Sequence, residues 1–282
     1  MAVKIITDSA ADLPYELYDN YGIDVFSINV CLEEREFKDE IEIKSIEVMD
    51  YMRSGKVVTT SQVAYVEFKE IFTEYARDKK TCIYIAFSSN LSGTYNTALL
   101  AKEEVQEIYP EFDLTIVDSK CATLGQGLVV LNAAILARDG ASKGEIIDEI
   151  DRKINHMEHI FTVENLEYLY RGGRISKASA VMGSLMKINP IMDVRDGKLQ
   201  PLEKARGRKK TLKRMVEIVG ERGYNLENQE IGINHGDCID EAHKLRDMIK
   251  KEYGTEKFII REIGSAIGAH TGPGLLGIYF LK

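Results

Sequence analysis

The chain has 282 residues, 44% hydrophobic and 29% charged, which is typical of a globular protein and excludes a disordered or membrane-embedded one. Acidic residues number 45 against 37 basic ones, and the net charge of −8 argues against nucleic-acid binding through the overall field. The four cysteines are widely spaced without a zinc or redox motif, and no leader or long apolar run opens the sequence. We therefore expect a cytoplasmic protein with free thiols and no bound metal.

The first half of the chain alternates short apolar runs with amphipathic helical patterns. We expect strands at residues 3–6, 23–32, 82–87 and 115–119, a β appendage at 35–43, and helices at 12–21, 45–52, 64–77 and 127–137. This rhythm predicts a parallel α/β layer sandwich.

After about residue 141 the pattern changes. Helices are expected at 146–154, 164–173, 176–188 and 239–254, and extended runs at 161–163, 191–205, 231–236, 257–263 and 277–281. Asp196-Gly197 divides one of these runs, which is a strong hairpin signal. We predict an α/β protein of two domains, parallel over residues 1–158 and mixed or antiparallel α+β over 159–282. The ligand site is expected between them, because no linker separates the halves and interdomain clefts commonly bind ligands.

Hydroxyl-bearing residues follow or flank several predicted strands, at residues 7–9, 59–62, 88–94 and 118–119. The carboxyl ends of parallel strands share one edge of a sheet, where ligands bind. The 92–94 stretch also precedes a helix, whose free amides favour an anion. Each stretch could instead only cap a helix.

Two basic segments can each be interpreted either as a binding site for an anionic ligand or partner or as a solvated surface. RGGRIS at 171–176 places two arginines around a glycine pair, suited to a carboxylate or phosphate or to a helix end. Residues 203–214 hold seven basic side chains and one acid at the start of a helix, where cations are unfavourable. This placement argues against helix stability alone as the reason for the cluster, and leaves a docking patch for an acidic partner or phosphate, or a solvated face.

The glycine-rich stretch 263–280 is expected to be a loop with His270 inside it. Nucleotide-binding glycine loops, the HExxH motif and the GxSxG motif are absent from the sequence. The residues therefore favour a protein that binds an anionic head group over one that breaks bonds.

Seven segments in order resemble the DegV family of bacterial fatty-acid-binding proteins over essentially the whole chain. They are ITDSAADLP, TTSQ, SSNLSGTYNTA, VDSKCATLGQG, LEYLYRGGRIS, KARGRKK and IGSAIGAHTGPGLLGIYF. One departure is Val63-Ala64, where the family usually carries Pro-Ser. It leaves the preceding hydroxyl pair in place.

This resemblance implies that one long-chain fatty acid lies in a closed tunnel between the two domains, with no other cofactor. It places the lipid carboxylate on a hydroxyl of Thr60 or Ser61, on the Ser92-Gly93 turn, and between Arg174 and His270. Helices 127–137 and 181–192 are our expectation for the tunnel wall, with ordinary core packing as the other reading.

The resemblance also implies a partner. Family members present the lipid to a separate ATP-binding fatty-acid kinase subunit, which forms an acyl phosphate for phospholipid synthesis, and Arg206 matches a position that engages this kinase. Transient membrane contact is compatible with this role; nucleic-acid binding is not expected.

The second functional hypothesis is an enzyme for a small phosphorylated or carbonyl substrate, with His270 or His235 as base. A third reading is a regulator whose residues 204–214 bind a partner or nucleic acid.

Overall fold

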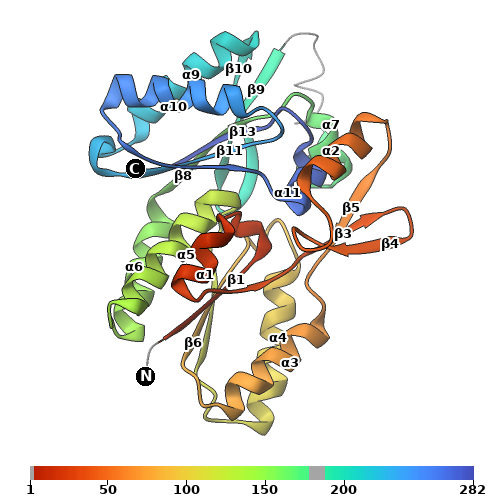
Figure 1. Cartoon of the computed structure of the whole chain (residues 1–282), viewed down its shortest axis with the longest axis vertical. Helices are drawn as coiled ribbons and strands as arrows, with labels where there is room; N and C mark the ends of the chain where they lie inside the picture. Colours follow the sequence, from red (N-terminus) through yellow and green to blue (C-terminus); the bar gives the residue numbers. More distant parts are fainter. Residues whose placement is uncertain (1–2, 178–187) are drawn as a thin grey trace.

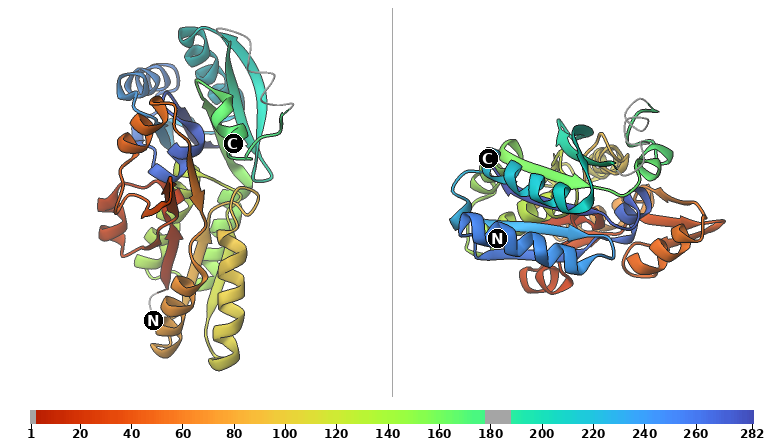
Figure 2. Two further views of the ribbon diagram at one scale, coloured as in Figure 1. Left: turned by 90° about the vertical axis from the view of Figure 1, so that its right-hand side faces the viewer. Right: turned by 90° about the horizontal axis from the view of Figure 1, so that it is seen from above.

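The computed structural model describes residues 3–177 and 188–282. Most of the helix expected at 176–188 and most of the expected wall segment 181–192 fall outside these ranges. The molecule is elongated, with α3 and α4 at one end and α9 and α10 at the other (Figures 1 and 2).

A parallel sheet in the order β2-β1-β6-β7 forms the first half of the fold. Its strands are β1 (Lys4–Asp8), β2 (Asp24–Phe26), β6 (Cys82–Ala86) and β7 (Leu114–Asp118). Its helices are α1 (Tyr15–Tyr21), α3 (Tyr65–Arg77), α4 (Thr94–Ile108), α5 (Thr123–Arg138) and α6 (Lys143–His156), with a 3-10 turn, η1, at Ser9–Ala11. Side chains alternate across the sheet, so Ile6 and Tyr84 share a core with α3 and α4 while Ile5 and Ile83 pack with α5.

A six-stranded mixed sheet in the order β10-β9-β8-β13-β11-β12 forms the second half. Its strands are β8 (Met157–Thr162), β9 (Ile188–Arg195), β10 (Lys198–Arg206), β11 (Glu230–His235), β12 (Lys257–Glu262) and β13 (Leu276–Leu281). Helices α9 (Arg208–Arg222) and α10 (Ile239–Tyr253) share a core with this sheet, α5 packs between the two sheets, and a 3-10 turn, η2, covers Leu226–Asn228 (Figure 1). The predicted α/β fold with a parallel and a mixed part is confirmed; the boundary after residue 158 stays a prediction.

The strand expected at 23–32 is in fact two strands in different sheets. β2 joins the parallel sheet, whereas β3 (Asn29–Leu32) pairs antiparallel with β4 (Arg35–Lys38) and β5 (Val58–Ser61). Between these two strands, the buried Ile28 amide donates to the Ser9 hydroxyl at 3.1 Å instead of to a neighbouring strand. The small sheet and α2 (Ser45–Arg53) project to the right in Figure 1.

The glycine-rich stretch expected to be a loop contains a helix, α11 (Ser265–Thr271), next to α7 (Leu166–Arg171). Ala266 and Ala269 are buried in the core of the first half, so small side chains let this late segment pack closely against it. A Cβ atom at Gly264 would lie 2.5 Å from Asp12 Oδ1. The glycine content therefore reflects close packing as well as turns.

Three carboxylates hold the first amides of α11. Asp12 accepts the Gly264 N–H at 2.9 Å, Glu40 that of the next residue at 3.3 Å, and Asp39 that of Ala266 at 2.9 Å. These amides have no partner within a helix, and the helix dipole also favours negative charge there. Arg261 pairs with Glu40 at 3.0 Å. This cluster ties the end of the chain to its beginning.

The hairpin tip is a second contact between the halves. Asp196 and Gly197 have φ angles of 48° and 75°, as a two-residue hairpin turn requires, which confirms the predicted turn. The Asp196 carbonyl accepts a hydrogen bond from the side-chain amide of Asn90 at 2.8 Å, and the Gly197 carbonyl accepts one from the Ser88 hydroxyl at 2.9 Å. The loop after β6 thus holds the mixed sheet in place.

The buried carboxylate Asp39 makes stability depend on pH. Burial is the main cause that raises its pKa from 3.8 to about 7, so between these values the folded chain keeps a proton that the unfolded chain loses. Its contribution to the free energy of unfolding is full below pH 4 and is lost as the pH rises through 7. Asp39→Asn keeps an acceptor for the Ala266 amide but cannot lose a proton. We therefore expect the free energy of unfolding of this variant to fall less between pH 4.5 and 7.5 than that of the unmodified protein, by on the order of 1–3 kcal/mol.

Urea unfolding at pH 4.5, 6 and 7.5 measures this effect, with the exposed Asp19→Asn as the charge-matched control. An Asp39→Asn curve parallel to that of the unmodified protein would show that Asp39 is ionised throughout.

Candidate ligand-binding site

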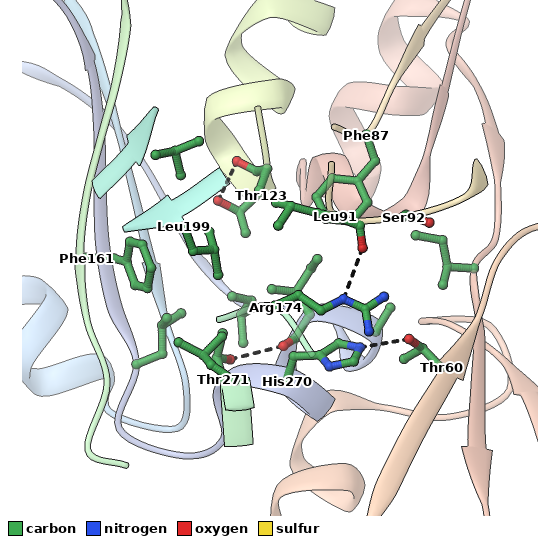
Figure 3. Close-up of a pocket in the computed structure, with 18 of the residues that line it drawn as sticks. Thr60, Phe87, Leu91, Ser92, Thr123, Phe161, Arg174, Leu199, His270 and Thr271 are labelled. Carbon is green, nitrogen blue, oxygen red and sulfur yellow. Dashed lines mark hydrogen bonds between the residues drawn. The ribbon is translucent and has the colours of Figure 1, made fainter. Parts of the chain in front are cut away.

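A cavity of about 360 Å³ lies where the two sheets meet α11, within the usual size range of small-molecule sites (Figure 3). Both halves of the fold contribute apolar wall residues, among them Ile28, Phe87, Phe161, Val194, Leu199 and Leu275. The cavity therefore exists only when the two halves are packed together.

All six residues predicted to bind the head group line this cavity: Thr60, Ser61, Ser92, Gly93, Arg174 and His270. In Figure 3, Thr60 and Ser92 lie on one side, Phe161 and Leu199 lie on the other, and the Arg174 guanidinium points toward the first pair. The cavity is thus most polar at one end, while the rest of its wall is mainly apolar. The head-group role of these residues stays a prediction.

His270 meets Thr60 at the polar end, 210 residues away in the sequence. Its Nε2 atom lies 2.8 Å from the Thr60 hydroxyl oxygen. Burial, with a smaller contribution from Arg174, lowers the pKa of His270 to about 3, so the ring is neutral at physiological pH. Its other nitrogen, Nδ1, is buried and has no hydrogen-bond partner among residues 3–177 and 188–282. Gly172 allows this approach, because a Cβ atom there would lie 2.1 Å from Nδ1.

Arg174 is half-buried and carries the cavity's positive charge. Its Nε donates to the Leu91 carbonyl at 3.0 Å, and its guanidinium also donates to the Gly172 carbonyl. Burial lowers its pKa, and no acidic side chain pairs with it in the described ranges. His159, the other wall histidine, has its pKa lowered to about 4 by burial. The wall residues described by the structure include no carboxylate, so this charge is uncompensated.

The Ser92-Gly93 turn leads into α4 beside Gln62. The Thr94 amide donates to the Ser92 hydroxyl oxygen at 3.2 Å. A Cβ atom at Gly93 would lie 1.9 Å from the Gln62 side-chain oxygen, so glycine is required for this contact. The first turn of α4 therefore reaches the cavity wall without an acidic side chain.

Thr60 and Ser61 differ in what their hydroxyls already do. Neighbouring residues of a strand face opposite sides. Ser61 donates to Glu36 at 3.4 Å and accepts from the Asn29 amide at 3.3 Å. The Thr60 hydroxyl bonds to His270 instead. The Ser61 proton is engaged outside the head-group cluster.

Other expectations lie away from this cavity. Of the four hydroxyl stretches, 59–62 and 88–94 contribute to the described wall, whereas 7–9 and 118–119 do not; Asp8 instead accepts from the Tyr84 hydroxyl and the Phe87 amide, both at 2.8 Å. Helix 127–137 packs in the core between the sheets. His235 is not among the cavity residues, and Arg206 is exposed at the end of β10.

Sequence analysis missed four polar wall residues: Thr123, His159, Thr271 and Tyr279. The His159 and Tyr279 rings pack edge to face on the neighbouring strands β8 and β13, with their centroids 5.4 Å apart. A lone histidine in a short apolar strand carries no signal of a site, because only the pairing of strands distant in the chain brings it to the cavity.

Among residues 3–177 and 188–282, no cluster of His, Cys, Asp and Glu is arranged to hold a metal ion. Within the same ranges, none of the helices has the length and apolarity needed to cross a membrane.

In the part of the chain that the structure describes, a two-part α/β fold encloses a mostly apolar cavity whose wall carries one cation, Arg174. The family model described as uncharacterised protein, DegV family, matches residues 2–282, and the chain belongs to this family. A DegV domain-containing protein of Clostridium perfringens is 42% identical over 280 residues, covering 98% of this chain and 96% of the relative.

Solved structures of two relatives superimpose along their whole length. A fatty-acid-binding DegV family protein from Thermus thermophilus has a TM-score of 0.90 at 28% identity, and DegV from Bacillus subtilis, a fatty acid binding protein, has 0.87 at 30%. Both alignments cover 100% of each chain.

Gly172→Ala tests the packing around His270. The new methyl group meets the ring, and we expect a loss of about 1–3 kcal/mol in stability together with a shifted His270 resonance. Thermal unfolding and the ¹³Cε1–¹H NMR spectrum of labelled histidine measure both effects. Gly144→Ala, in α6 with open space at its Cβ position, is the control and should not destabilise the protein. An undisturbed His270 signal in Gly172→Ala would contradict the described packing.

Proposed function

We propose that this protein binds one long-chain fatty acid, with the hydrocarbon tail among the apolar wall residues and the carboxylate at Arg174. The observation that carries the proposal is the uncompensated Arg174 guanidinium at the polar end of an otherwise mostly apolar cavity. A carboxylate is costly to bury without hydrogen bonds and a countercharge, and Arg174 provides both. The relatives from Thermus thermophilus and Bacillus subtilis bind fatty acids, which supports this ligand class.

Thr60 is the better head-group donor of the two candidate hydroxyls. If the neutral His270 ring carries its proton on Nε2 and donates it to Thr60, the Thr60 hydroxyl proton is free for the carboxylate. The Ser61 proton is engaged with Glu36. Ser92 and the backbone amide of Gly93 complete a shell of donors that adds no second charge. We therefore assign the carboxylate to Thr60, Ser92, Gly93 and Arg174, with His270 orienting Thr60.

The tail supplies most of the driving force. About 15 buried methylenes at ~0.8 kcal/mol each give a gross apolar term of roughly 12 kcal/mol. Only part of this appears as affinity, because binding also costs translational and conformational freedom.

The protein then acts as a carrier that presents the carboxylate to a separate ATP-binding kinase subunit, in the cytoplasm and for phospholipid synthesis. A carboxylate oxygen attacks the γ-phosphorus of the ATP held by the kinase, the bond to the ADP oxygen breaks, and acyl phosphate and ADP result. Arg206 is the proposed contact, exposed beside Lys209 and Lys210 where β10 turns into α9. Collecting an insoluble ligand implies transient contact with a membrane surface.

The competing enzyme reading is weaker on chemical grounds. A general base is most effective with a pKa near the working pH. Burial instead lowers the pKa of His270 to about 3, and its Nε2 atom is engaged with Thr60. His235 also has its pKa lowered by burial and lies away from the cavity.

Two head-group variants test the lipid assignment. We expect Ser92→Ala to weaken palmitate binding by about 1.5–3 kcal/mol, the usual cost of a hydrogen bond to a charged group. Arg174→Met should cost at least as much, because it leaves a buried carboxylate unpaired. Displacement of a fluorescent fatty acid measures the dissociation constants. Ser54→Ala removes a surface hydroxyl that bonds only to the Tyr51 carbonyl and serves as the control. Unchanged palmitate binding in both head-group variants would exclude this site.

Arg206→Ala tests the partner surface independently. The expected outcome is unchanged palmitate binding with kinase-dependent acyl phosphate formation reduced by about tenfold or more, as for loss of a central interface arginine. Arg77→Ala, at the opposite end of the molecule on α3, is the matched control and should retain full turnover. Equal turnover in all three proteins would remove Arg206 from the kinase interface.

A further inference from the structure

A second cavity of about 230 Å³ adjoins the polar end of the first. It shares Thr60, Arg174 and His270 with the first cavity, so these three residues form the wall between the two spaces. Its other walls come from the segment after α2, which contributes Lys56, and from the end of α7, which contributes Arg171. A carboxylate held at Arg174 would therefore have this space on its far side.

The charged side chains that line this second cavity in the described ranges are all basic: Lys56, Arg171 and Arg174. Lys56 lies 3.3 Å from Glu33, and Arg171 lies 2.9 Å from Glu167, but neither glutamate lines the cavity. All four of these side chains are about half exposed or more, and ion pairs of this kind hold their members weakly. Both cations can therefore turn toward an anion in the cavity.

The two cavities differ in the number of positive charges that line them. The first has the single cation Arg174, which matches the single negative charge of a carboxylate. A phosphate group bound through one oxygen carries about 1.5–2 negative charges at neutral pH, which the first cavity cannot balance. The second cavity adds two cations on the far side of Arg174.

We propose that the second cavity is a phosphate-binding subsite, which takes a phosphoryl group joined to the head group of the lipid or brought up to it. This inference rests on the proposed fatty-acid function and deepens it. Arg174 is suited to serve both spaces, because its guanidinium bonds to Leu91, which lines the first cavity, and to Gly172, which lines the second. Figure 3 shows this guanidinium between Leu91, Ser92 and His270.

The buried Nδ1 atom of His270 lies on the same side. It has no hydrogen-bond partner in the described part of the chain and is packed against Gly172, a wall residue of the second cavity. A small shift at Gly172 would bring this nitrogen to the cavity, where the ring can accept a hydrogen bond or, next to a dianion, hold a proton.

Hexadecyl phosphate and palmitate, which differ in the head group, test the subsite. The variant is Lys56→Met with Arg171→Met; the control is Arg53→Met with Lys69→Met, which removes two exposed, ion-paired cations outside both cavities. We expect the variant to bind hexadecyl phosphate about tenfold or more weakly, palmitate about as well as the unmodified protein, and the control to bind both normally. Titration with inorganic phosphate in the presence of palmitate distinguishes free phosphate from a phosphoryl group attached to the lipid.

Each outcome has one meaning. Phosphate binding to the palmitate-loaded protein that is lost in the Lys56/Arg171 variant assigns the subsite to free phosphate as well. A loss confined to hexadecyl phosphate assigns it to the attached phosphoryl group. The subsite would be overturned if the Lys56/Arg171 variant bound both lipids equally weakly, or bound hexadecyl phosphate as tightly as the unmodified protein does. It would also be overturned if the unmodified protein bound palmitate but not hexadecyl phosphate. Failure to bind palmitate at all would instead overturn the proposed function.

Discussion

The placement of α11 is the constraint on which the rest of the site depends. Asp12, Asp39 and Glu40, from the first 40 residues, accept the amides of residues 264–266 near the end of the chain. Asp12 and Asp39 are fully buried, and burial raises the pKa of both, because the hydrogen bonds from the helix amides offset only part of the cost of burying a charge. The same contact brings His270 to Thr60 and adds Ala266 and Ile267 to the cavity wall. Anchoring this short helix therefore creates the site.

The proposed selectivity for a fatty acid rests on the scarcity of charged side chains in the cavity wall. The described wall contains one cation, two histidines kept neutral by burial and no carboxylate, with apolar side chains opposite. Such a wall favours a singly charged anion attached to a hydrocarbon tail over small polyanions or neutral metabolites. The neighbouring basic cavity adds positive charge only beyond the head group, where a phosphoryl group would lie.

Local patterns in the sequence predicted the alternating elements and the Asp196-Gly197 turn, and the resemblance to the DegV family predicted the residues that cluster at the polar end. Contacts between distant segments account for the failures. The run 23–32 looks like one strand because its apolar content is continuous, but its two ends pair with different sheets. Residues 265–271 look like a loop because glycine disfavours helices, yet carboxylates far away in the chain cap a helix there. His159 was missed because only β8–β13 pairing places it at the wall.

Native mass spectrometry of the freshly purified protein, combined with mass analysis of its organic extract, tests the central claim most directly. The account predicts one fatty acid per chain, released as an intact long-chain carboxylic acid when the protein unfolds. A lipid-free protein that also fails to gain the mass of one palmitate after incubation with it would contradict the account.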